Sequence, residues 1–141
     1  MAMKSGKSAL ARIRKICLAL PESHEKLAWE APTFRVRDKI FAMFSNDHHG
    51  DGRVALWCKS THDVQATVVE EDPDRFFVPP YVGGAGWIGI RLDKGLEWDV
   101  VTDFVRASYR AIAPKRLRAA SEDADASEAG RRAPPRRRAR A

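Results

Sequence analysis

The order of the elements that the sequence predicts places this 141-residue chain in the α+β class. Segments with helical periodicity lie at both ends and in the middle of the first 120 residues, and short segments that alternate apolar and polar residues lie between them. The hydrophobic content of 44% is typical of a domain with a packed core. We therefore expect one domain in which helices pack on one face of an antiparallel sheet.

The first half of the chain predicts a helix followed by strands. Residues 8–20 carry apolar side chains such as Ile13 and Leu20 on one face, and Pro21 ends this helical pattern. The segments that follow are rich in aromatic and β-branched residues and are punctuated by polar turns. Strands are expected at residues 24–29, 34–36, 40–44 and 53–59, with a tight turn at 37–39 and a loop at 46–52.

The second half predicts two further helices around one strand. Ser60 and Asp63 have the spacing of a capping box, so a helix is expected to begin at Ser60 with Val64, Val68 and Val69 on its apolar face. Pro73 is expected to start a short turn that carries Phe76 and Phe77. A Pro- and Gly-rich loop at 79–86, a strand at 87–92 and a helix at 97–112 complete the domain, and Gly86 is expected to supply a positive φ.

The folded domain is expected to span residues 5–118. Residues 119–141 contain no apolar side chain larger than alanine and are acidic first and Arg-rich last, so the sequence predicts a disordered tail. The apolar runs fall far short of the ~20 residues that span a bilayer, and no secretory signal stands out, so we expect a cytoplasmic protein with no membrane contact. The two cysteines, Cys17 and Cys58, lie in apolar settings and are expected to be buried, reduced thiols.

Five short segments of the chain form a recognisable series. In order, they are Leu20-Pro21-Glu22, Ala31 to Val36, Lys39 to Ala42, Pro80 to Gly83 with Gly86-Trp87, and Ser108-Tyr109-Arg110 with Ala113 to Leu117. Over roughly residues 8–118 this series resembles the MmcQ/YjbR family of small bacterial proteins. The resemblance implies a fold similar to the CyaY (frataxin-like) sandwich and DNA binding through a pair of β-hairpin wings. This sequence departs from the family at Gly84, where relatives commonly carry a lysine.

The basic residues favour contact with a phosphate backbone. If Phe34 and Val36 face the core, Arg35 must point outward from the same strand, with Arg37 on the same side. Outward guanidinium groups suit phosphate contacts, although a solvated face with ordinary surface charge explains the same pattern. No base-reading motif stands out, so weak sequence preference is expected. The candidate nucleic-acid-binding residues are Arg35, Arg37, Lys39, Arg53, Lys59, Arg91, Arg110, Lys115 and Arg116.

Catalytic, metal and cofactor signals are weak. The chain contains no nucleophile elbow and no phosphate-binding loop, so we expect a non-enzymatic protein without a cofactor. His48 and His49 lie beside Asp47 and Asp51, but no spacing completes a tetrahedral metal site, and we expect none. An alternative of another class remains open. In it, the protein is a protein-interaction or small-ligand module that uses an aromatic surface formed by Trp29, Tyr81 and Trp87.

Overall fold

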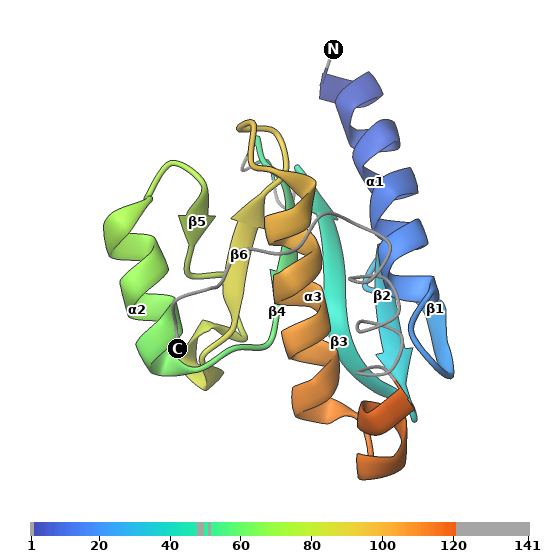
Figure 1. Ribbon diagram of the computed structural model, residues 1–141. Helices are drawn as coiled ribbons and strands as arrows, with labels where there is room; N and C mark the ends of the chain where they lie inside the picture. Colours follow the sequence, from blue (N-terminus) through green and yellow to red (C-terminus); the bar gives the residue numbers. More distant parts are fainter. Residues whose placement is uncertain (1, 48–49, 51, 121–141) are drawn as a thin grey trace.

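The computed structural model describes residues 2–47, 50 and 52–120, with side chains from residue 7 onward. Within these residues the strands form a six-stranded sheet of order β1-β2-β3-β4-β6-β5, and all neighbouring strands are antiparallel (Figure 1). The predicted α+β class is thereby confirmed. The elements are α1 (Ala2–Leu18), β1 (Ser23–Ala28), β2 (Ala31–Val36), β3 (Lys39–Asn46), β4 (Val54–Cys58), α2 (His62–Glu71), β5 (Phe76–Phe77), the 3-10 turn η2 (Gly83–Ala85), β6 (Ile88–Arg91) and α3 (Trp98–Ile112).

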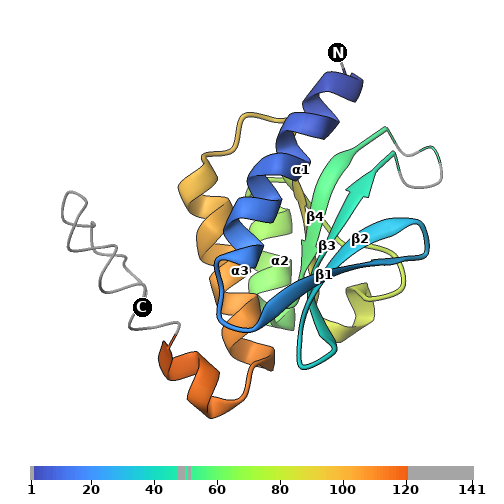
Figure 2. The ribbon, with the colours of Figure 1, turned by 90° about the vertical axis from the view of Figure 1, so that its right-hand side faces the viewer.

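The helices α1 and α3 cover one face of the sheet, and α2 packs beside β5 at its edge (Figure 1). Alternate strand residues, among them Phe34, Phe44 and Leu56, face these helices and form the core. Figure 2 shows the sheet from its side, with the helices to the left and the β1–β2 hairpin bending away to the right. We call the face turned away from α1 and α3 the outer face.

Two local predictions are wrong. The α2 helix is capped by Thr61 rather than Ser60, because the extended backbone of Thr61 lets its hydroxyl accept a hydrogen bond from the Val64 amide. The short turn expected to carry Phe76 and Phe77 is instead the strand β5, whose two residues pair with the edge of β6. The second error arises because the hydrogen bonds that decide the conformation of β5 come from β6, which a local pattern does not reveal.

Two hairpin turns of the same type join the first three strands. Ala28 pairs with Ala31 and Val36 pairs with Lys39, so each turn has only two residues. Trp29 and Glu30 have φ of 50° and 62°, and Arg37 and Asp38 have φ of 53° and 65°. Left-handed backbone at both positions matches the right-handed twist of the flanking strands. The turn at 37–39 agrees with the sequence analysis, whereas the Trp29–Glu30 turn lacks the usual glycine or asparagine.

Helix α3 is anchored to the sheet by two polar side chains in the core. The Ser108 hydroxyl donates to the Phe41 carbonyl at 2.6 Å and accepts from the Lys59 amide at 2.9 Å. The Tyr109 hydroxyl donates to the Pro21 carbonyl at 2.6 Å, and its ring meets the Phe41 ring edge-on. These bonds fix α3 against β3, against the end of β4 and against the chain that follows α1.

Both cysteines are buried in the core, as predicted. Burial raises the pKa of the Cys17 and Cys58 thiols, because the thiolate loses its hydration inside the protein. At neutral pH both therefore carry their protons, and neither has the low pKa of a reactive nucleophile.

Candidate functional site

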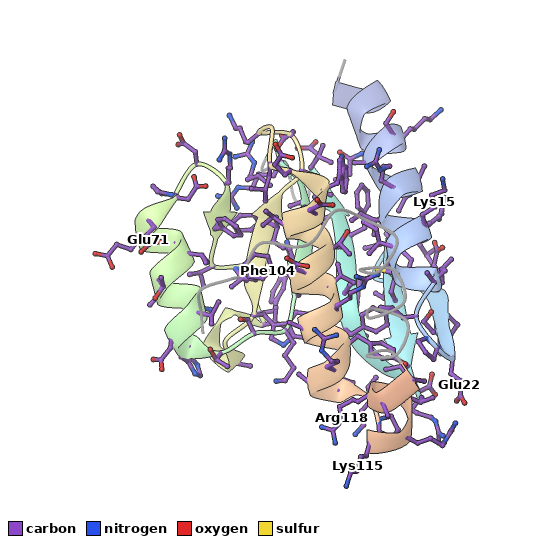
Figure 3. The ribbon with its side chains drawn as sticks, in the orientation of Figure 1. Lys15, Glu22, Glu71, Phe104, Lys115 and Arg118 are labelled. Carbon is purple, nitrogen blue, oxygen red and sulfur yellow. The ribbon has the colours of Figure 1, made fainter. Side chains whose placement is uncertain are left out.

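One end of the molecule collects cations from two distant parts of the chain. Glu22 binds Arg37 of the β2–β3 turn at 3.4 Å and Arg116, which follows α3, at 3.0 Å. Lys39 begins β3 beside this turn, and Lys115 is adjacent to Arg116 in sequence. Figure 3 shows Glu22, Lys115 and Arg118 at this same end. We call the exposed set formed by Arg37, Lys39, Lys115, Arg116 and Arg118 the basic end.

The basic end carries more positive than negative charge. Among the described residues, Glu22 lies between two of its arginines, and Asp38 lies in the turn and is 3.8 Å from His24. The hydrogen bond from Arg116, reinforced by Arg37, lowers the pKa of Glu22. Glu22 is therefore fully ionised at neutral pH and orients two guanidinium groups without neutralising the whole set. Such a surface can attract phosphate groups.

Three other predicted contact residues are held by contacts within the protein itself. Arg35 is half-buried on the outer face, where its Nε donates to the Thr33 hydroxyl at 3.1 Å. Arg53 stacks over the Phe77 ring at 4.0 Å. Arg91 donates two hydrogen bonds to Asp93, at 3.0 and 3.1 Å.

The ion pair between Arg91 and Asp93 is partly buried. Burial opposes ionisation of the Asp93 carboxyl, but the hydrogen bonds and charge of Arg91 outweigh it, so the pKa of Asp93 is lowered. Arg53 precedes β4 and Arg91 ends β6, and the antiparallel register places both at the end of the sheet opposite the β2–β3 turn. The structure therefore does not bring these two arginines together with Arg37.

The remaining two candidates lie nearer the basic end. Lys59 follows β4 on the side of the sheet where β3 begins, and Arg110 lies in the last turn of α3, which leads into the Lys115–Arg116 segment. Both are half-buried. Gly84 is exposed, and a side chain at this position would meet no atom within 4 Å. Nothing steric therefore explains why a lysine is missing there.

A cavity of about 720 Å³ lies at the end of the sheet where β3 ends, and Leu10 of α1 and Phe44 also line it from the helix-covered side. We call it the outer-face cavity because Met43, Ser45 and Trp57 line it from the outer face. Its lining includes Trp29, Met43, Ser45, Trp57 and Tyr81, which come from the β1–β2 turn, from β3, from β4 and from the loop before η2. Two members of the aromatic surface expected from the sequence, Trp29 and Tyr81, thus line one cavity. Trp57, which the sequence analysis did not include in that surface, also lines the cavity, whereas Trp87 is not among its lining residues.

Neither a metal-binding cluster nor a membrane-spanning helix is found in the part of the chain that the structure describes. No group of three His, Cys, Asp or Glu side chains is placed to hold a metal ion there. His48, His49 and Asp51 lie outside the described residues, as does the Arg-rich segment from residue 121 onward. None of the described helices combines the length and the apolar composition needed to cross a bilayer.

Comparisons with known proteins agree with the fold. The family model described as YjbR matches residues 18–111. The crystal structure of Deinococcus radiodurans protein DR2400, with a DUF419 domain, is similar at a TM-score of 0.66 and 17% identity over 80% of this chain and 87% of that chain. At this identity the similarity shows the fold alone. Comparison with curated proteins gives no match.

Proposed function

The chain belongs to the YjbR family, and on that premise we propose that it is a non-enzymatic protein that binds the DNA backbone through its basic end. The observation that supports this function is the pairing of Glu22 with both Arg37 and Arg116, which joins the β2–β3 turn to the segment after α3. A hairpin turn beside a second basic segment offers cations at two points of one surface. The relation of this fold to the frataxin-like sandwich is part of the same proposal.

The chemistry of the basic end suits phosphate more than base edges. Its lysines and arginines are exposed at a turn and at a short helical segment, residues 115–120, where long side chains reach outward. Each cation that contacts a phosphate releases a counterion, so affinity should fall steeply with salt. Contacts to phosphate carry no sequence information by themselves. We therefore propose weak sequence preference.

A salt titration of duplex binding tests this function with the full chain. Replacing Lys39 and Lys115 with alanine should weaken binding and flatten the slope of log affinity against log salt by about 1.8, since each lost phosphate contact removes about 0.9. The double variant Lys15→Ala, Lys94→Ala is the matched control, because it loses the same charge at exposed positions elsewhere. Figure 3 shows Lys15 far from Lys115.

A variant that removes a negative charge from the basic end provides a second test. Glu22→Gln removes the carboxylate that holds Arg37 and Arg116, so it should strengthen binding and leave the salt slope at least as steep. If the Lys39/Lys115 variant and its control lose affinity equally, binding depends on net charge and the basic end is not the contact surface. If the full chain shows no salt-dependent binding at all, the proposed function is wrong.

A further inference from the structure

The outer-face cavity exists because β2 separates from β3 at one end. The described pairing of these strands reaches Thr33 opposite Met43 and does not continue to Ala31 and Pro32. Pro32 has no backbone N–H to donate, and the β1–β2 hairpin bends outward at this point (Figure 2). The resulting volume of about 720 Å³ falls within the range of about 300–1,000 Å³ that is usual for small-molecule sites.

The walls of the cavity are largely aromatic and apolar. Trp57 is 2% exposed and lines it from the sheet, together with Met43 of the neighbouring strand. Trp29 and Tyr81 are 76% and 79% exposed, so they form the rim. Both rim residues have left-handed backbone, with φ of 50° and 69°. At Trp29 this conformation is set by the two-residue hairpin turn, whereas Tyr81 adopts it in the loop before η2, where no hairpin requires it.

The lining also contains a buried hydroxyl group that lacks a hydrogen-bond partner among the described residues. The Ser45 side chain is 5% exposed, and its Oγ has no hydrogen-bond partner among the described residues. Buried polar atoms in folded proteins nearly always have a partner. Ser45 lines the cavity but its Oγ is shielded from it, so a rotation of the side chain would turn the hydroxyl toward a polar group of a bound molecule and supply the missing hydrogen bond.

The described charged residues that line the cavity are all negative. Glu30 lies at the tip of the β1–β2 hairpin and Asp47 directly follows β3, and both are exposed. The described lining contains no lysine and no arginine. Carboxylates beside exposed aromatic rings attract organic cations, because the faces of the rings carry partial negative charge. The same carboxylates would repel phosphates and other anions.

We propose that the outer-face cavity binds a small organic ammonium compound with an apolar or aromatic body. The body packs between Trp29, Tyr81 and Trp57, the ammonium group lies toward the carboxylates of Glu30 and Asp47, and a polar group of the ligand reaches Ser45. This site is separate from the basic end and does not depend on DNA binding.

Three phenyl compounds of similar size and different charge test the ligand class. Phenethylamine is a cation, phenethyl alcohol is neutral and phenylacetate is an anion at neutral pH. Binding is followed by tryptophan emission and by calorimetry on the full chain. Phenethylamine should bind about tenfold more tightly than phenethyl alcohol, and phenylacetate should bind most weakly. Equal affinities, a preference for phenylacetate, or no binding of phenethylamine at millimolar concentration would overturn the proposal.

Matched variants then locate the site. Trp29→Ala should weaken both phenethylamine and phenethyl alcohol severalfold, whereas Leu27→Ala, an equally exposed change on the same hairpin, should not. Glu30→Gln should reduce only the preference for the amine. Asp38→Asn is its control, because Asp38 occupies the same position in the other two-residue turn. If Leu27→Ala or Asp38→Asn has the same effect as its partner, the probes bind elsewhere and the site is wrong.

Discussion

Substituting Ser108 with alanine removes one oxygen atom from the core and breaks two hydrogen bonds. The Ser108 hydroxyl bridges the Phe41 carbonyl in β3 and the Lys59 amide after β4, and its side chain is fully buried. Alanine keeps the helical backbone of α3 and leaves almost no cavity. The cost of Ser108→Ala therefore comes from the two backbone groups that lose their partner.

The expected loss follows from these two groups. A buried donor or acceptor left without a partner costs about 1–3 kcal/mol, so the pair should cost about 2–6 kcal/mol of the free energy of unfolding. A protein of this size is typically stable by only about 5–15 kcal/mol, so the change is large. Urea unfolding measures it directly. With a slope of about 2 kcal/mol/M, the midpoint should fall by about 1–3 M at an unchanged slope.

A control and a second readout make this prediction specific. Ser8→Ala changes an exposed serine in α1 and should move the midpoint very little. Hydrogen exchange of the Lys59 amide should accelerate in Ser108→Ala beyond what the lower global stability explains, because that amide has lost its acceptor. A midpoint shift no larger than that of Ser8→Ala, with unchanged exchange at Lys59, would refute the bridging role of Ser108.

Two further predictions concern the packing of the sheet and the cysteines. Gly89→Ala should lower the free energy of unfolding, measured in urea, by about 1–3 kcal/mol, because a Cβ there would overlap the Phe77 ring. Gly84→Ala is the control and should cost much less, because its surroundings are open. Equal effects of the two variants would contradict this packing. Cys17 and Cys58 should react with a thiol reagent only as fast as the protein unfolds, since both are buried and the pKa of each thiol is raised. Rapid labelling of the native protein would contradict their burial.

Much of the fold could be predicted because alternation along a strand reports directly on burial. Phe34 and Val36 are fully buried and Arg35 between them is half-buried, so the pattern and the outcome agree. Short elements could not be predicted in this way. The two residues of β5 show no periodicity, and only the neighbouring strand β6 gives them their conformation.

The candidate sites were harder to predict because they depend on contacts between distant segments. Arg37 and Arg116 share Glu22 as a partner, although Arg116 lies 94 residues from Glu22 in sequence. One feature of the sequence could have indicated the cavity. All five residues of β4, Val54–Cys58, are buried, and an uninterrupted apolar strand indicates that both faces of a sheet are covered. That run could have shown that Trp57 is buried on the outer face of the sheet.

The basic end and the outer-face cavity have opposite charge and lie at opposite ends of β3. Lys39 begins this strand and Asn46, which lines the cavity, ends it, so at about 3.3 Å per residue the two are roughly 23 Å apart. This separation is well beyond the screening length of about 8 Å at physiological salt. A cation in the cavity therefore cannot weaken DNA binding through its charge. Coupling would have to pass through the two strands that join the sites, β3 and β2, since β2 begins beside the cavity and ends at the turn that carries Arg37.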